Sequence, residues 1–405
     1  MFGSLRVRNY RLYAIGQTVS VGGTWMQSIA TGWLALQLSH SGTVLGVVIG
    51  ARFAPLLLLG PWGGLIVDRV DNRRLIVITQ TCLALLSYGL AALAWCGVLT
   101  LPVLIAMVTG MGCVNVFDGP SRQSLIPQLV DRRLLPNAIA LNSVMMNGAK
   151  LVGPAVGGGL ISAIGVTPCF LANGTSFAVV VGTLLLMRWS ELYPAERATR
   201  AKGQIRAGLV YVGRNPALLY PLLMVVVTGI LTWEFPVTLP LITTATFHAG
   251  AGAYGGAMAI MSVGAVCGGL VAARRRRVSV RSLAVSAVIW GVLIVLASVM
   301  PVLPALFGVL IFVGAGSITF NSSAKTLLQM EAAPQMRGRV MSLWSIAWQG
   351  GTVIGAPVVG AVGSGLGARY ALALSGVAAL AVGAVIVALR FRTAEGEGAP
   401  LTGAR

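Results

Sequence analysis

The ten residues GAKLVGPAVG at positions 148–157 return as GTVIGAPVVG at positions 351–360, 203 residues later. A glycine, a proline and a second glycine keep their places in both copies, and each copy lies in a long apolar segment. Small residues let helix backbones approach closely, and proline bends a helix. The repeat therefore indicates a chain built of two related halves, each with one closely packed, bent helix at the same place.

The repeat extends beyond this motif. Phe117 and Phe320 keep the same spacing, as do Arg122 and Lys325. A hydrophilic stretch over 188–215 separates the two copies, and a short amphipathic helix at 205–212 or a disordered linker is expected there. We predict an N-terminal six-helix bundle at 1–187, a cytoplasmic linker at 188–216, a C-terminal six-helix bundle at 217–391 and a cytoplasmic tail at 392–405.

The composition points to a membrane protein. The 405 residues are 56% apolar and only 10% charged, whereas about a quarter of the residues of soluble domains are charged. A membrane-spanning helix needs roughly 20 mostly apolar residues, and backbone in a bilayer must be helical or form a closed barrel. Twelve segments satisfy this: 12–38, 43–66, 75–96, 101–121, 137–163, 166–187, 217–243, 252–273, 279–300, 302–324, 340–363 and 369–390. We predict an all-α protein with twelve transmembrane helices in two pseudo-symmetric six-helix bundles.

The charges predict the orientation. The chain holds 29 Lys and Arg against 10 Asp and Glu. The basic residues lie between apolar segments rather than on one soluble face, which argues against nucleic-acid binding. With the N-terminus inside, 26 of the 29 fall on the cytoplasmic side. The positive-inside rule then places both termini in the cytoplasm and the chain in the inner (plasma) membrane.

The loop after the second segment carries a family resemblance. Its sequence, GLIVDRVDNRR at 64–74, resembles the signature loop of the major facilitator superfamily. That resemblance implies twelve helices around a central cavity. It also implies a gating latch in this loop and at the end of the fourth span, formed by Gly64, Asp68, Arg69, Arg73, Arg74, Asp118 and Arg122. In such a latch Asp68 would meet the helix N-terminus near Gly338 in the opposite half.

The loop also departs from the family pattern. Asp71 stands where a glycine is usual and Asn72 where a base is usual, while Ala273 replaces the corresponding acid in the second half. Three further stretches, GTWMQ at 23–27, PSRQSLIP at 120–127 and NAIALN at 137–142, resemble the enterobactin-exporter-like branch. That branch contains siderophore and drug efflux proteins, some of them drug:proton antiporters.

Acidic residues inside spans are candidates for proton coupling, because such groups are costly in a bilayer and usually functional. Glu234 lies well inside the seventh segment, where desolvation favours the neutral acid, and Pro236 and Pro240 predict a bend beyond it. A structural ion pair with Arg52 or Lys150 is the alternative. Asp118 is the second candidate, and an ion pair with Arg69, Arg73 or Arg74 is its alternative.

Other polar and aromatic residues are candidates for lining a substrate cavity. Arg52 and Lys150 are compatible with binding an anionic substrate and equally with buried cations satisfied by backbone carbonyls. The full set is Trp25, Gln27, Arg52, Asn115, Asn147, Lys150, Trp233, Trp344 and Gln349. About half of the polar and aromatic members are expected only to form interhelical hydrogen bonds or to lie at the membrane interface.

The glycine-rich run in the fifth segment resembles the antiporter motif of the superfamily. Its residues Gly148, Gly153, Pro154, Gly157 and Gly158 imply a tight gate between the halves, with ordinary helix packing as the alternative.

These observations favour a proton-coupled exporter of small organic molecules that works by alternating access as a monomer. Flipping of a lipid or lysolipid is the alternative on the same fold. A membrane enzyme lacks support, because the two His and scattered Ser give no nucleophile with its base. An ATP-driven pump also lacks support, because the sequence contains no Gly-x4-Gly-Lys-Ser/Thr loop for binding nucleotide phosphates. The five cysteines form no CxxC pair and no His/Cys cluster, so we expect no metal or other cofactor.

Overall fold

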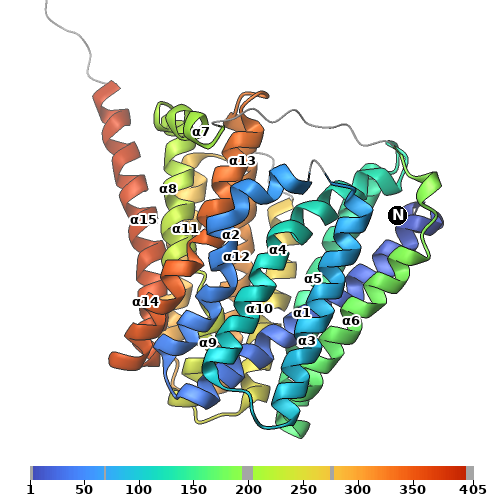
Figure 1. Cartoon of the computed structure of the whole chain (residues 1–405). Coiled ribbons are helices and arrows are strands. Elements are labelled where there is room, and N and C mark those ends of the chain that lie inside the picture. Colours follow the sequence, from blue (N-terminus) through green and yellow to red (C-terminus); the bar gives the residue numbers. More distant parts are fainter. Residues whose placement is uncertain (1–2, 68–69, 194–203, 274–277, 398–405) are drawn as a thin grey trace, which may run out of the picture.

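The computed structural model describes residues 3–67, 70–193, 204–273 and 278–397, and every regular element in these ranges is helical (Figure 1). In chain order the elements are η1 (Gly3–Arg6), α1 (Arg8–Ser39), α2 (Gly42–Val67), α3 (Asn72–Trp95), α4 (Leu101–Leu129), α5 (Leu135–Ile164), α6 (Thr167–Leu185), η2 (Trp189–Glu191), α7 (Gln204–Gly213), α8 (Pro216–Leu231), α9 (Phe235–Leu241), η3 (Ile242–Thr246), α10 (Ala251–Ala273), α11 (Val280–Ser298), α12 (Leu303–Glu331), α13 (Arg337–Ser345), η4 (Ile346–Gly350), α14 (Thr352–Gly365) and α15 (Ala368–Glu397).

Ten segments within the described ranges are long and apolar enough to cross a membrane. Helices α1 and α5 are not among them, although they contain 32 and 30 residues. Their hydropathy is lower because they carry polar side chains such as Gln17 and Gln27 in α1 and Asn147 and Lys150 in α5. Polar side chains on such long helices are expected to face protein or a cavity rather than lipid.

The seventh predicted segment is broken rather than continuous. Helix α8 ends at Leu231, and α9 starts at Phe235, so that Glu234 lies between the two. Pro236 has no N–H to donate to the Thr232 carbonyl, which explains why the helix restarts at this point. The segment ends in a π-helical turn, η3. The predicted bend is present, but the break lies at Glu234 and not beyond it.

The helices pack as two groups. Helices α1–α6 pack mainly on one another, as do α8–α15, and the groups meet chiefly where α2 contacts α14 and α5 contacts α10. In Figure 1 the first group leans to the right and α8, α14 and α15 lie to the left. The predicted helix at 205–212 is present as α7, and it packs on α13, with Gly208 against Arg339.

Candidate functional site

A cavity of about 350 Å³ lies mainly within the first helix group. Most of its lining residues belong to α1, α2 and α4, and a few belong to α3, α5 and α6. Pro236, Tyr254 and Met258 reach it from the second group. The predicted residues that line it are Trp25, Gln27, Arg52, Asn115, Asp118 and Arg122. The other predicted residues, Asn147, Lys150, Trp233, Glu234, Trp344 and Gln349, are not among those that line it.

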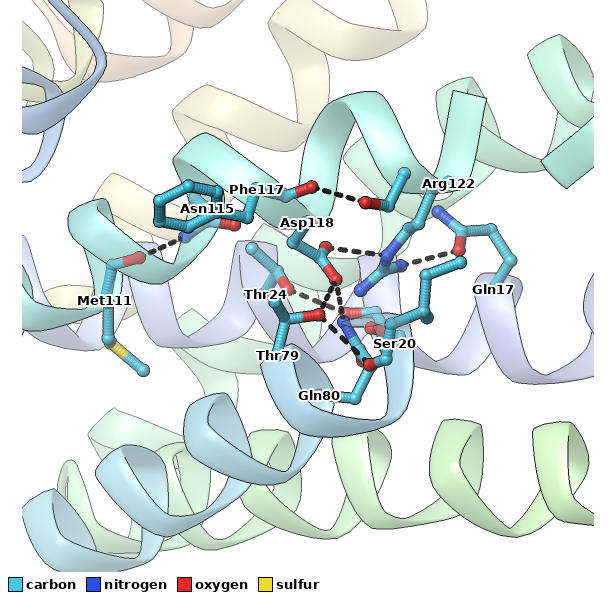
Figure 2. A network of polar contacts seen from close by, with 12 residues as sticks. Gln17, Ser20, Thr24, Thr79, Gln80, Met111, Asn115, Phe117, Asp118 and Arg122 are labelled. Carbon is cyan, nitrogen blue, oxygen red and sulfur yellow. Dashed lines mark hydrogen bonds and ion pairs between the residues drawn. The ribbon is translucent and has the colours of Figure 1, made fainter. Parts of the chain in front are cut away.

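Asp118 forms a buried ion pair with Arg122, one turn further along α4. The carboxylate oxygen lies 2.7 Å from Arg122 Nε. The other oxygen accepts hydrogen bonds from Thr79 Oγ1 at 2.9 Å and Gln80 Nε2 at 2.6 Å, both from α3 (Figure 2). Arg122 Nη1 in turn donates to Gln17 Oε1 at 2.6 Å. Helices α1, α3 and α4 are therefore joined by one charged network.

The predicted pairing of Asp118 with the basic residues of the signature loop is wrong for Arg73 and Arg74. Arg73 stacks on the Trp189 ring at 4.7 Å, and Arg74 lies 4.0 Å from Asp71. The loop is instead tied to α4 by Asn72, whose Nδ2 donates to the Ser121 carbonyl at 3.1 Å and to Ser124 Oγ at 3.0 Å. The pairing geometry favours Arg122, because residues four apart on a helix are neighbours.

The predicted latch also includes Gly64, Asp68 and Arg69. Asp68 and Arg69 lie outside the described residues, and of Gly64 only its position in α2 is described. The contact of Asp68 with the helix N-terminus near Gly338 stays a prediction.

Gln27 is the centre of a second buried network. Its Oε1 accepts hydrogen bonds from Asn173 Nδ2 at 2.7 Å and from Ser87 Oγ at 3.0 Å, and its Nε2 lies 3.1 Å from the sulfur of Met111. Gln27 itself is 4% exposed. The residues predicted from the sequence do not include the five polar partners in these two networks, Asn173, Ser87, Gln17, Thr79 and Gln80. Their only signal in the sequence is that they are polar residues in apolar helices.

Two cations lie beside α1. Arg52 on α2 donates from Nη1 to Ser28 Oγ at 2.6 Å. Lys150 on α5 has its ammonium 5.8 Å from the centre of the Trp25 ring. Both side chains are half-buried. Neither forms an ion pair with a described carboxylate, so their predicted pairing with Glu234 is not found in the described chain.

Three predicted polar residues bond within their own helices. Asn115 donates to the Met111 carbonyl, Asn147 to the Ser143 carbonyl and Gln349 to Ser345 Oγ. Of these, only Asn115 also lines the cavity. Each of these three bonds links successive turns of one continuous helical segment and does not join separate spans.

The second helix group holds an aromatic cluster. Trp233 lies 4.3 Å from Trp348, 5.8 Å from Trp290 and 6.1 Å from Phe235, measured between ring centres. Phe320 stacks on Trp290 at 5.6 Å. Trp344 stacks on Trp348 at 6.0 Å, and Lys325 Nζ lies 5.4 Å from the Trp344 ring. The repeat position of Arg122 is thus occupied by a cation that contacts an aromatic ring instead of a carboxylate.

Glu234 lies next to this cluster at the helix break. It is 1% exposed. A Cβ added to Gly355 of α14 would lie 3.0 Å from its Oε1, so the carboxyl group packs directly on that helix. Thr352 of α14 is the polar side chain that faces it, but neither oxygen is in hydrogen-bonding geometry with a described donor. Burying a carboxylate without a partner is very unfavourable, which favours the protonated acid in this state.

Glycines bring the two helix groups into close contact near the starts of α2 and α10, where these helices meet the last turns of α14 and α5. A Cβ on Gly255 of α10 would overlap the Pro154 carbonyl and the Cα of Gly158 on α5. On the other side, a Cβ on Gly46 of α2 would overlap Ala356 of α14, and one on Gly360 would overlap the Gly42 carbonyl. We call Gly42, Gly46, Gly158, Gly255 and Gly360 the glycine seal.

The residues of the predicted gate motif pack on two different helices, α10 and α1. Pro154 and Gly158 face α10 and belong to the contact between the groups. Gly153 and Gly157 instead pack on α1, against Gly22, Trp25 and Met26. Gly148 has no described atom of another element within 4 Å of an added Cβ.

The comparisons with known proteins identify the family. The family model described as "Transmembrane secretion effector", a group within the major facilitator superfamily, matches residues 1–402. The chain belongs to this family. It is thus a multi-pass membrane transporter of the major facilitator superfamily and not an enzyme.

Among relatives of this major facilitator transporter is the staphyloferrin A transporter of Staphylococcus aureus (strain NCTC 8325 / PS 47), 26% identical over 62% of this chain and 63% of the relative. The multidrug efflux pump Tap of Mycolicibacterium fortuitum is 24% identical over 84% of this chain and 87% of the pump. A bacterial homologue of the human lysosomal transporter Spinster, in an inward-facing and unoccupied conformation, has a TM-score of 0.72 at 15% identity over 96% of this chain and 97% of that chain. This last likeness concerns the fold alone.

Proposed function

We propose that this transporter is a proton-coupled exporter of small organic molecules, of the drug or siderophore class, that works by alternating access. The observation that carries the proposal is the cavity, which residues of both helix groups line. The close backbone contacts of the glycine seal between the two groups support it. Alternating access requires such a site between two bodies that can rock against each other. The printed names of the relatives, a siderophore transporter and a multidrug efflux pump, support this class of cargo.

The proposal includes a topology. In it α1 and α5 also cross the membrane, because at about 1.5 Å per residue either helix exceeds a bilayer core of about 30 Å. That gives twelve spans in two pseudo-symmetric halves, 1–187 and 217–391, with the linker 188–216, the tail 392–405 and both termini in the cytoplasm. The protein would act as a monomer in the plasma membrane.

A cysteine scan tests the topology. In a Cys-free background, a cysteine at position 203 should be protected from an impermeant thiol reagent added to whole cells, and one at position 248 should be labelled. Labelling at 203 and protection at 248 would contradict the orientation.

Within this proposal Glu234 carries the proton and Asp118 does not. Asp118 is already held by Arg122, Thr79 and Gln80. Protonation of its carboxylate would remove the ion pair with Arg122 and weaken the two hydrogen bonds. Glu234 has no charged partner in the described chain and packs on α14, one of the helices of the glycine seal. Ionisation of a buried acid favours a state that admits water. Loss of the proton would therefore push α14 away from Glu234 and loosen the seal.

Purified protein in vesicles with a trapped pH-sensitive dye tests the coupling. Addition of ethidium, a fluoroquinolone or a citrate-based siderophore should make the dye report substrate-dependent proton movement for at least one compound. A protonophore should abolish accumulation of that compound. Transport that ignores the protonophore but requires added nucleotide would contradict the proposal.

A further inference from the structure

The cations Arg52 and Lys150 lack a counter-charge in the described chain. Every described ion pair lies elsewhere: Asp71 with Arg74, Asp118 with Arg122 and Glu191 with Arg188. A cation held away from bulk water is costly unless an anion or several acceptors satisfy it. A negatively charged group bound beside Arg52 and Lys150 would therefore stabilise both cations.

The two cations approach one face of α1. Arg52 contacts Ser28, and Lys150 lies over Trp25. Residues 25 and 28 are three apart, so their side chains are neighbours on the helix surface. Arg52 comes from α2 and Lys150 from α5, so the two charges reach this face from different helices. Trp25, Ser28 and Arg52 all line the cavity.

Arg52 retains unused donors. A guanidinium carries five N–H groups in a planar fork that matches a carboxylate, and the hydrogen bond to Ser28 is the one that Arg52 donates to a described partner. The acid that shares the cavity, Asp118, is already paired with Arg122. Next to Arg52 the lining turns apolar, with Ile49, Phe53 and Met111.

We propose that this face of α1 is an anion subsite, in which Arg52 and Lys150 bind the carboxylate of an organic anion whose apolar body lies against Ile49, Phe53 and Met111. The inference rests on the proposed function, since it treats the cavity as the place where cargo binds. It adds that the cargo is an organic anion.

Calorimetric titration of purified protein with 2-naphthoate and its neutral isostere 2-naphthamide, at fixed ionic strength, tests the subsite. We expect naphthoate to bind at least about tenfold more tightly, which corresponds to about 1.4 kcal/mol. Arg52→Gln and Lys150→Gln should each remove most of that preference and leave the affinity for naphthamide unchanged. Arg52→Lys and Lys150→Arg should retain part of it.

Lys325→Gln is the matched control, because Lys325 also lies over a tryptophan but belongs to α12 of the second helix group and not to the helices beside α1. It should leave the preference intact. Equal affinity for the two compounds would overturn the proposal, as would a loss of both affinities together in Arg52→Gln and Lys150→Gln. Inorganic phosphate that competes as strongly as naphthoate would also overturn it, because the apolar body would then contribute nothing. Binding is measured without a gradient, so a failure of proton coupling would not affect these results.

Discussion

The interiors of the two helix groups differ: the first contains networks of polar and charged side chains, and the second contains packed aromatic rings. In the first group, Asp118, Arg122 and Gln27 are held by hydrogen bonds and an ion pair that join four helices. In the second group, tryptophans and phenylalanines fill the corresponding space, and the indole N–H groups of Trp233, Trp290 and Trp344 have no described acceptor. Glu234 lies beside them, likewise without a hydrogen-bond partner in the described chain.

The difference separates a rigid region from a region that can change. A buried network in which each member contacts several partners holds one arrangement, because any movement breaks several interactions at once. An unsatisfied buried polar group costs about 1–3 kcal/mol, so the second group is stabilised when a proton or water satisfies such a group. We expect the first group to hold its shape and the second to respond during transport.

The sharpest test of this contrast is Glu234→Gln. If Glu234 carries the proton, one pH unit drives about a tenfold accumulation for one proton exchanged, equivalent to about 1.4 kcal/mol, and the variant should fall to a ratio of about 1. Binding and exchange of the cargo should persist, as measured by counterflow in vesicles. Asp118→Asn is the matched variant of the first group. The fraction of this variant that folds should still accumulate cargo in response to the pH gradient. A Glu234→Gln variant that still accumulates cargo would place the coupling elsewhere.

Arg122→Gln tests the rigidity of the first group. It leaves Asp118 buried with Thr79 and Gln80 but without a cation, and breaking a buried ion pair in this way costs about 3–5 kcal/mol. The free energy of unfolding, measured by denaturant titration in detergent, should fall accordingly. The double variant Asp118→Asn/Arg122→Gln should recover part of the loss. Equal losses in the single and double variants would mean that the pair contributes little.

Gln27→Leu should have an intermediate effect. It removes the oxygen that accepts from Asn173 and Ser87, which leaves two buried donors unpaired at a cost of about 1–3 kcal/mol. Thermal unfolding in detergent measures this, and Gln27→Glu, which keeps an acceptor, is the control. A Gln27→Leu variant as stable as the parent would show that water replaces Gln27 in the network.

Lys325→Gln should have the smallest effect. The residue occupies the repeat position of Arg122, yet it contacts an aromatic ring and is exposed. Such an exposed contact contributes at most about 1 kcal/mol. A loss as large as that of Arg122→Gln would remove the contrast between the two groups.

Much of the fold follows from the sequence, because the length and apolar composition of the segments leave few alternatives. The position of the break in the seventh segment could also have been predicted from the sequence, since Pro236 has no N–H to donate to the Thr232 carbonyl. The Asp118–Arg122 pair obeys a local rule, four residues along one helix, but the family resemblance favoured a partner in the loop. Local spacing was a better guide than the resemblance for Arg73 and Arg74.

Other parts of the site depend on how helices are rotated against one another. Nothing in the positions of Gln27, Ser87 and Asn173 along the chain says that they meet. The approach of Gly158 to Gly255 likewise depends on packing between the two groups. A glycine-rich run predicts close packing but does not name the partner, which is why Gly153 and Gly158 of one motif face different helices.

The glycine seal has a thermodynamic consequence. Ordering a side chain at an interface costs up to about 2 kcal/mol for Lys, Arg or Met, but nothing for glycine. Backbone that meets backbone at Gly255 and Gly46 therefore freezes no rotamers when this end closes, and none are released when it opens. The closed end has little entropic preference of its own. In the proposed cycle, small differences in how each state holds a proton and its cargo would then be enough to decide which way the transporter faces.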